Sequence, residues 1–259
     1  MVAEPIRLER DGPVAILVLE DPPLNLFGQA AFEALAHHVT ELAASDARAL
    51  VWRADGDIFS GGVDVHNFHG ISENDSQHMF SNLISTVRKL EALPIPTVAL
   101  VHALCLTAAL EVSLGCDMIW SAESARFGLV EAVVGLTPGA GGTQRMAERA
   151  GPARAREFVM TGGLYDAQTL ERWNVINRVL PDDQLLEKGM AFAHRLAAGP
   201  TRAHGATKKI IRAYLEGGVD KADRETPKVS GGLFQTEDLK RAVESFLRDG
   251  PGKATFEGR

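Results

Sequence analysis

The stretch TVALVHALCLTAALEVSLGCDMIWSA, residues 97–122, decides the fold class of this chain. It begins with an apolar run at 97–101, which predicts a buried strand. Residues 106–115 then predict a helix, and residues 117–122 predict a second strand. A strand, a helix and a strand in this order imply right-handed crossovers and an α/β core.

The same alternation extends toward the amino terminus. The segments PVAILVLED (13–21) and ALVWRA (49–54) are predicted strands. Apolar residues between and after them recur at helical spacing, which predicts two amphipathic helices. The first helix carries Phe32, Leu35, Ala36, Val39 and Leu42, and the second carries Phe80, Leu83, Ile84, Val87 and Leu90 before it stops at LPIP.

From about residue 139 the chain is predicted to be mostly helical, with one strand-like segment, VINRVL at 175–180. The predicted helices cover residues 153–160, 167–173, 184–197, 201–216 and 236–247. We therefore divide the chain into an α/β core, residues 1–200, and a C-terminal helical region, residues 201–259.

The composition is typical of a soluble globular protein, since 45% of the 259 residues are hydrophobic and 24% are charged. The formal net charge of -7 argues against nucleic acid or an anionic membrane surface as the main partner. The amino terminus lacks the apolar core of a secretory signal, and the longest apolar run, residues 98–110, is too short to span a bilayer. We expect a cytoplasmic protein with no membrane partner.

Few residues offer disulfide or metal chemistry. Cys105 and Cys116 alone define no disulfide framework and no zinc site, so we expect both to be buried thiols in a reducing compartment. His66 and His69, in the HNFH motif, have a spacing that a metal could use, but no Glu or Cys accompanies them. We expect no metal.

Two Gly-rich segments, FSGGVDV (59–65) and LTPGAGGTQR (136–145), suggest special backbone geometry. In the second, Gly139 and Gly141 begin a dinucleotide-binding pattern, but Gln144 stands where the third glycine belongs. The Lys-Ser/Thr pair of a phosphate-binding loop is missing as well, so a nicotinamide oxidoreductase is discarded. Because this loop ends where a helix begins, it favours a negative or electron-rich partner.

Two glutamates lie within apolar segments, Glu111 in CLTAALEVSLGC and Glu131 in FGLVEAVVG. An unpaired buried carboxylate is energetically expensive, so such a group is paired, protonated or used in chemistry. Each glutamate could instead point to solvent from an otherwise buried element. Two such carboxylates beside two Gly-rich loops favour acid–base chemistry.

These motifs, in this order, resemble the crotonase (enoyl-CoA hydratase/isomerase) superfamily. The resemblance rests on DIFSGGVDV (57–65), on the stretch from ALCLTAALEVSLGCD to GGTQRMAERAG (103–151), on GGLYDAQTLERWNVINRVLP (162–181) and on the closing KATFEGR (253–259). It implies a spiral of repeated ββα turns followed by helices. It also implies an acyl-CoA substrate, no further cofactor, and a homotrimer or dimer of trimers in which residues 201–259 make oligomer contacts.

The resemblance also implies the residues of a site. The backbone N–H groups of Gly61 and Ala108 would form an oxyanion hole for the thioester carbonyl. Glu111 would hold and activate water, and Glu131 would exchange the proton at Cα. Residues 63–80 and 132–137 are expected to line the acyl pocket. By position, the substrate and its CoA would contact Ser60, Gly62, Val63, Asp64, Thr107, Gly139, Lys253 and Phe256.

One departure from the resembled pattern bears on function: Thr107-Ala108-Ala109 replaces the usual glycine-rich triplet before the first glutamate. Three hypotheses follow. A 2-enoyl-CoA hydratase is favoured because both glutamates are present. Another crotonase-type acyl-CoA reaction is the second, especially that of an enoyl-CoA isomerase, which would need only a carboxylate such as Glu131. A catalytically weak acyl-CoA-binding or scaffold protein is the third, since the altered triplet reshapes the acyl pocket.

Overall fold

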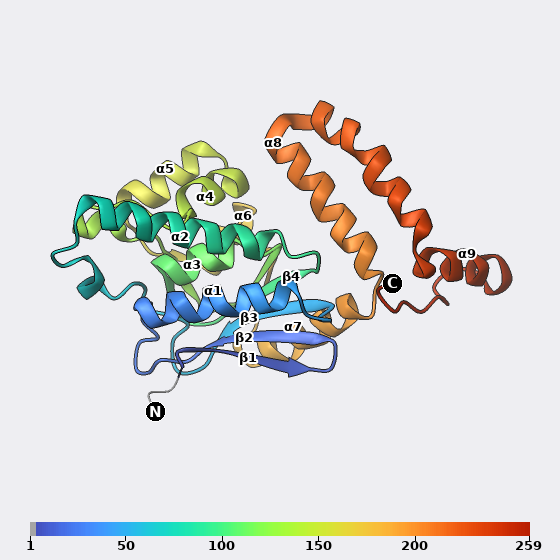
Figure 1. The fold of residues 1–259 in the computed structure, drawn as a ribbon. Coiled ribbons are helices and arrows are strands. Elements are labelled where there is room, and N and C mark those ends of the chain that lie inside the picture. Colours follow the sequence, from blue (N-terminus) through green and yellow to red (C-terminus); the bar gives the residue numbers. More distant parts are fainter. Residues whose placement is uncertain (1–3) are drawn as a thin grey trace.

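The computed structural model describes residues 4–259, which fold around a six-stranded sheet (Figure 1). The strand order is β1-β2-β3-β4-β6-β9, in which β1 and β2 are antiparallel and the other neighbours are parallel. The strands are β1 (Ile6–Asp11), β2 (Val14–Leu19), β3 (Ala49–Ala54), β4 (Thr97–Val101), β6 (Met118–Ala122) and β9 (Arg178–Leu180). The predicted α/β core is confirmed.

Helices surround this sheet and follow it in the chain. The α-helices are α1 (Gln29–Ala43), α2 (Glu73–Glu91), α3 (Thr107–Leu114), α4 (Gly142–Ala150), α5 (Pro152–Thr161), α6 (Ala167–Arg172), α7 (Leu185–Ala197), α8 (Thr201–Gly232) and α9 (Glu237–Asp249). Four 3-10 turns are η1 (Val65–Phe68), η2 (Glu131–Val134), η3 (Asp182–Gln184) and η4 (Leu233–Gln235). The predicted helices of both halves are thus present, and apart from α8 their ends differ from the prediction by a few residues.

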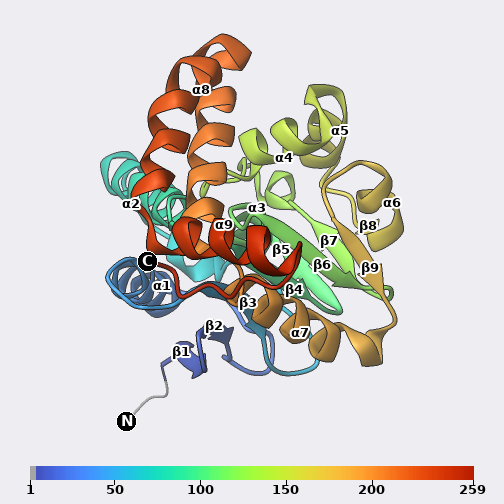
Figure 2. The same cartoon turned by 90° about the vertical axis from the view of Figure 1, so that its right-hand side faces the viewer.

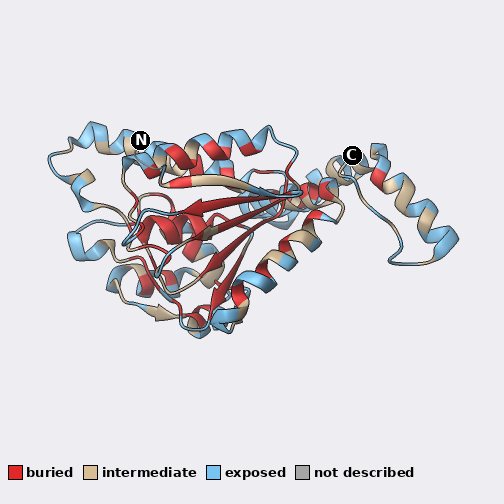
Figure 3. Cartoon of the chain, turned by 90° about the horizontal axis from the view of Figure 1, so that it is seen from below, coloured by how far each residue is buried: buried red, intermediate tan, exposed pale blue. Residues whose placement is uncertain are grey.

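The central strands are covered on both faces. All six residues of β2 are buried, and Figure 3 shows the neighbouring strands in the buried colour as well. Helix α7 packs against β2, β3, β4 and β6, while α1 packs against β1 and α2. Strands covered on both faces have no polar side, which is why these segments are continuous apolar runs.

A second, three-stranded sheet has the order β5-β7-β8 and comprises β5 (Leu104–Leu106), β7 (Arg126–Gly128) and β8 (Tyr165–Asp166). Strand β4 leads through β5 into α3, and β6 leads through β7 into η2. These two turns of the chain therefore each give one strand to each sheet before a helical segment, as in the expected ββα repeat. Three-residue strands are too short to show an alternating pattern, so sequence analysis did not predict β5 or β7.

The C-terminal helices stand away from the two sheets (Figures 1 and 2). Helix α8 extends beyond the predicted 201–216. Its helical conformation is interrupted at Gly217 and Gly218, and the chain then continues as a second helical arm. Figures 1 and 2 show the two arms side by side. The division of the chain at residue 200 stays a prediction. Within residues 4–259, no helix has both the length and the apolar character needed to cross a bilayer.

The chain end is anchored to this helical region. Buried Asp238 of α9 accepts hydrogen bonds from the N–H groups of Glu257 (2.8 Å) and Gly258 (2.7 Å). Arg48, just before β3, donates to the carbonyl of Phe256 at 2.9 Å and to that of Gly199 at 2.8 Å. The tail is therefore docked against the protein rather than left as a frayed end.

Candidate active site

Glu111 lies in α3, a helix whose eight residues are all buried. One of its carboxylate oxygens, Oε1, accepts hydrogen bonds from the N–H groups of Ala140 and Gly142, each at 2.8 Å. Both donors belong to residues 139–142, here called the GAGG loop, at the start of α4. The electron-rich partner expected for this loop is therefore a carboxylate of the same chain.

The glycines of the GAGG loop are required by close contacts. A Cβ atom on Gly142 would lie 2.8 Å from Cγ of Glu111, and one on Gly139 would lie 2.3 Å from the Phe80 ring. Gly141 has a φ of 101°, a left-handed conformation that favours glycine. Larger residues at these positions would displace the carboxylate or the loop that holds it.

Arg145 of α4 supports the same loop from behind. Its guanidinium is buried, and it donates to the carbonyl of Gly141 at 3.1 Å. It also forms a bidentate ion pair with Glu91 of α2, with N···O distances of 2.6 and 2.7 Å. A bidentate pair fixes geometry as well as charge, so α2 and α4 together hold the loop against Glu111.

Glu131 is the first residue of η2, a turn that ends at Gly135 in the left-handed conformation. Its Oε2 is buried, and no hydrogen-bond partner for it lies among residues 4–259. Burial, together with the nearby Glu111 charge, raises the pKa of Glu131 to about 7. Glu131 is a carboxyl group with a free oxygen and a proton available near neutral pH.

Burial also raises the pKa of Glu111 to about 7, although the backbone N–H groups of Gly142 and Ala140 oppose the rise. Hydrogen bonds to the charged form favour ionisation, and Glu131 has no comparable donors at Oε2. When the pair holds a single proton, the proton is therefore favoured on Glu131 and the negative charge on Glu111. The two acids thus have unequal surroundings within one cavity.

Both glutamates line one cavity of about 20 Å³, which is large enough for about one water molecule. The other residues that line it are Phe32, Val63, Phe68, Met79, Phe80, Leu83, Ala108, Leu136, Thr137, Gly139 and Ala140. Both segments predicted to line the acyl pocket, 63–80 and 132–137, contribute residues to this cavity.

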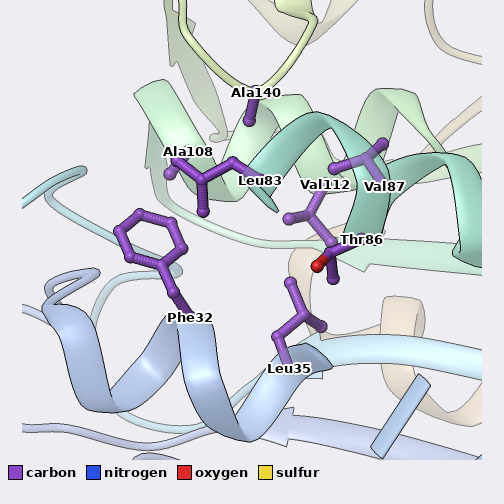
Figure 4. Close-up of a pocket in the computed structure, with 8 residues that line it drawn as sticks. All are labelled: Phe32, Leu35, Leu83, Thr86, Val87, Ala108, Val112 and Ala140. Carbon is purple, nitrogen blue, oxygen red and sulfur yellow. The ribbon is translucent and has the colours of Figure 1, made fainter. Parts of the chain in front are cut away.

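An apolar cavity of about 10 Å³ adjoins the first and shares four of its lining residues. Figure 4 shows Phe32 and Leu35 of α1 pointing toward side chains of α2 and α3 across this space. Ala108 and Ala140 line both cavities. The cavity that contains the acid pair therefore borders a small apolar cavity between α1, α2 and α3.

The structure corrects one predicted donor of the oxyanion hole. The N–H of Gly61 donates to the carbonyl of Leu24 at 2.8 Å, so its single hydrogen is already used. Gly61 is not among the residues that line the cavity, whereas Val63 is. The error arose because position in the motif does not reveal which N–H of an extended loop faces the pocket. The other predicted donor, Ala108, lines the cavity and lies in the first turn of α3, where helix N–H groups have no partner within the helix.

Other predicted contact residues have structural partners. Ser60 is buried, donating to the carbonyl of Asn25 at 2.6 Å and accepting from the N–H of Gly62 at 3.0 Å. Asp64 caps η1 through the N–H of His66. Lys253 and Phe256 lie in the docked tail and are not among the cavity residues.

Sequence analysis missed Ala140 and Arg145 as contributors to this site. Both were quoted only within the Gly-rich loop, whereas Phe80 falls within the predicted lining segment 63–80. The Gly-rich loop itself could have pointed to them. Because this loop does not match a nucleotide-binding motif, its free backbone N–H groups need another acceptor, such as a side chain of the same protein. Cys105 and Cys116 are buried and free, as predicted, and burial raises the pKa of both thiols.

Comparisons with known proteins place this chain in a family. The model of the family described as enoyl-CoA hydratase/isomerase matches residues 9–259. A Mycobacterium bovis protein named "Probable enoyl-CoA hydratase" is 28% identical over 249 residues, covering 95% of this chain and 96% of the relative. A Rhizobium meliloti protein of the same name is 28% identical over 261 residues, covering 100% of both.

Solved structures show the same fold. An enoyl-CoA hydratase from Bacillus anthracis superposes with a TM-score of 0.91 at 26% identity, covering 98% of this chain and 100% of the other. A Geobacillus kaustophilus structure, titled as a subunit of the same kind of protein, gives 0.90 at 28% identity, covering 99% and 100%. The predicted spiral of ββα turns with a helical C-terminal region is confirmed.

Proposed function

The chain belongs to the enoyl-CoA hydratase/isomerase family, and from that premise we propose that it adds water across the Cα=Cβ bond of a 2-enoyl-CoA. In this reaction the thioester carbonyl accepts negative charge as an enolate when water attacks Cβ. A base must take a proton from the water, and an acid must deliver one to Cα. Glu111 and Glu131 provide these two functions.

The proposed roles follow from the environments of the two acids. Ionised Glu111, fixed by Ala140 and Gly142, accepts a proton from the water that attacks Cβ. Protonated Glu131, with its oxygen free in the cavity, delivers a proton to Cα. Proton return from Glu111 to Glu131, directly or through water, restores the starting state. Donors near Ala108 stabilise the enolate oxygen.

One observation carries this proposal: buried Glu111 and half-buried Glu131, both with raised pKa values, share an otherwise largely apolar cavity. A fold needs no such pair, because each buried acid costs folding free energy. Enzymes that donate and accept protons near neutral pH use acids tuned in this way.

The test uses the absorbance of the conjugated thioester. Purified protein is incubated with crotonyl-CoA and, separately, with a 3-enoyl-CoA. Hydration predicts loss of absorbance with the first substrate, at a rate proportional to enzyme. Gain of absorbance with the second alone would replace the proposal by isomerisation, and silence with both would favour acyl-CoA binding without catalysis.

Isomerisation of the double bond is the second candidate, and the unequal state of the two acids favours it. Glu111 already accepts two hydrogen bonds at Oε1, whereas Glu131 alone has a buried oxygen without a partner. A single carboxylate that removes a proton and returns it to another carbon suffices for this reaction. The two-substrate assay above separates the candidates.

We propose further that the protein assembles as a homotrimer or a dimer of trimers through residues 201–259. Several large apolar side chains of α8, η4 and α9 are exposed, namely Ile211, Tyr214, Leu215, Val219, Phe234, Val243, Phe246 and Leu247. Exposed apolar clusters of this kind mark interaction surfaces. Light scattering should give a trimer or hexamer mass for the parent protein and a smaller mass for Phe246→Asp.

In such an assembly, Lys253 and Phe256 would contact the CoA of an adjacent subunit, since neither lines the cavity of its own chain. Lys253→Ala should then weaken CoA binding only in the assembled protein. We also place this reaction in the cytoplasm, where the free thiols of Cys105 and Cys116 would stay reduced.

A further inference from the structure

The backbone N–H of Val63 points toward α3 and not into the loop that contains it. On either side of Val63, the carbonyl of Gly62 accepts from Phe27 at 2.8 Å, and the N–H of Asp64 donates to Phe27 at 3.1 Å. Because successive peptide groups of an extended chain alternate in direction, the Val63 N–H faces the other way. There it donates to the hydroxyl oxygen of Thr107 at 2.8 Å.

The backbone on both sides of this contact is unusual. Thr107, the first residue of α3, has a φ of 44°, in a region that a β-branched residue rarely adopts. Gly62 has a φ of 101°, and a Cβ atom there would lie 2.4 Å from Oγ1 of Thr107. Two uncommon conformations thus hold the hydroxyl at the Val63 N–H. Such outliers persist where the surrounding structure enforces them, and they cluster at functional sites.

The Thr107 hydroxyl still has a hydrogen to donate. A threonine hydroxyl can donate one hydrogen bond and accept two. Among residues 4–259, its only hydrogen bond is the one that it accepts from Val63. Thr107 itself is buried and is not among the residues that line the cavity, but two cavity residues flank it: Val63, to which its hydroxyl is hydrogen-bonded, and Ala108, which follows it in the chain.

We propose that Thr107 is a catalytic residue whose O–H donates to the thioester oxygen of the substrate, with the Ala108 N–H as the second donor. The Val63 N–H then acts through Thr107, because a hydroxyl that accepts one hydrogen bond donates a stronger one. This inference rests on the proposed acyl-CoA chemistry and differs from an oxyanion hole of two direct backbone N–H groups. It gives the threonine of the altered Thr107-Ala108-Ala109 triplet a function.

The experiment compares Thr107→Val, which keeps the branched shape, with Thr107→Ala and Thr107→Ser. The readout is the absorption band of bound cinnamoyl-CoA, which moves to longer wavelength when its carbonyl oxygen accepts hydrogen bonds. Turnover of crotonyl-CoA and thermal stability are measured alongside. Thr40→Val is the matched control, since Thr40 is exposed on α1 and its hydroxyl donates to the Ala36 carbonyl.

The parent, Thr107→Ser and Thr40→Val proteins should show the full band shift and similar kcat values. Folded Thr107→Val and Thr107→Ala proteins should lose most of the shift and about 10²–10³-fold in kcat. The inference would be overturned if Thr107→Val and Thr107→Ala showed the same band shift as the parent protein. It would also be overturned if either variant had a higher kcat than the parent, because the hydroxyl would then block the site. A parent that shifts the band but hydrates nothing would refute the proposed function alone, and a parent without a shift would refute the role of Thr107.

Discussion

Glu111 and Glu131 are acids of the same type with pKa values raised in the same direction, yet the regions around them are built differently. Glu111 comes from a fully buried helix, and two N–H groups of the GAGG loop fix one of its oxygens. Glu131 comes from a short 3-10 turn, and its buried oxygen has no partner among the described residues. One region fixes a charge in place, and the other leaves a proton free to move.

This contrast explains how one cavity can hold an acid and a base. Two identical carboxyl groups in identical surroundings would share a proton evenly. Here the N–H donors and the Arg145 charge favour the ionised form of Glu111, and the Glu111 charge favours the protonated form of Glu131, which is the order that the proposed mechanism requires. The geometry of the GAGG loop, rather than the chemical type of the acids, sets the difference.

The largest expected effect comes from neutralising each acid in turn. Glu111→Gln and Glu131→Gln should each slow hydration by about 10²–10⁴-fold, because each removes a positioned acid or base. Glutamine retains the oxygen that Ala140 and Gly142 need, so Glu111→Gln should still fold. If Glu111→Gln kept its hydration rate while Glu131→Gln lost it, only one acid would be catalytic and the contrast would have no functional meaning.

A smaller effect is expected when the GAGG loop that binds Glu111 is changed and both acids are kept. In Gly142→Ala the new methyl would lie 2.8 Å from Cγ of Glu111, so the carboxylate must move. A displacement of about 1 Å can cost about 10²-fold in rate, and we expect a loss of that order in kcat. Gly231→Ala is the matched control, because a Cβ there meets nothing within 4 Å. Equal kcat values for the two folded variants would refute the claim that the GAGG loop positions Glu111 for activity.

Removing the support behind the loop should cost less again. Arg145→Met deletes the ion pair with Glu91 and the bond to the Gly141 carbonyl, so the loop should loosen. We expect a decrease in kcat of about tenfold and a further rise in the pKa of Glu111, whose ionised form loses a favourable charge. The acid limb of the pH–rate profile for kcat/KM reports this shift. Glu91→Gln should have a weaker effect on kcat. A pH–rate profile that stays unchanged in Arg145→Met would show that Arg145 does not support the site.

The smallest effect is on stability and depends on pH. Burial raises the pKa of Glu131 from 4.5 to about 7, so between these values the folded protein binds more protons than the unfolded chain. The contribution of the protonated Glu131 carboxyl group to the free energy of unfolding is therefore complete below about pH 4.5. This contribution is lost as the pH rises through about 7. Glutamine cannot ionise, so Glu131→Gln should melt about 2–4 °C above the parent near pH 8 and no higher near pH 4.5.

Thermal melts of both proteins at the two pH values check this sign. Glu33→Gln, at an exposed position on α1, serves as the matched control. A stabilisation of Glu131→Gln that is equal at both pH values would show that ionisation of Glu131 does not oppose folding.

The sequence was sufficient for some of these features and not for others. Glu111 and Glu131 could be selected because acids inside apolar segments demand an explanation. That Ala140 and Gly142 bind Glu111 could not be predicted, since about 30 residues separate them and only the packing of α3 against α4 joins them. Strand β5 was missed because three residues show no period.

The choice of an oxyanion donor was limited in the same way, although the positions concerned are only two residues apart. The motif placed Gly61 at the thioester, whereas the Gly61 N–H donates to Leu24 and the Val63 N–H faces Thr107. Pairing of this loop with Phe27 fixes which peptide groups point inward. That pairing is a long-range contact, so no local pattern reveals it.

The most direct test of the central claim is the fate of solvent atoms in the product. Crotonyl-CoA is incubated with the protein in water enriched in ¹⁸O and deuterium, and the product is analysed by mass spectrometry and NMR. If Glu111 activates water and Glu131 protonates Cα, the 3-hydroxyacyl-CoA carries ¹⁸O at Cβ and one deuterium at Cα, and Glu111→Gln and Glu131→Gln each form it far more slowly. Deuterium exchange without ¹⁸O in the product, or neither label after prolonged incubation, would contradict the account.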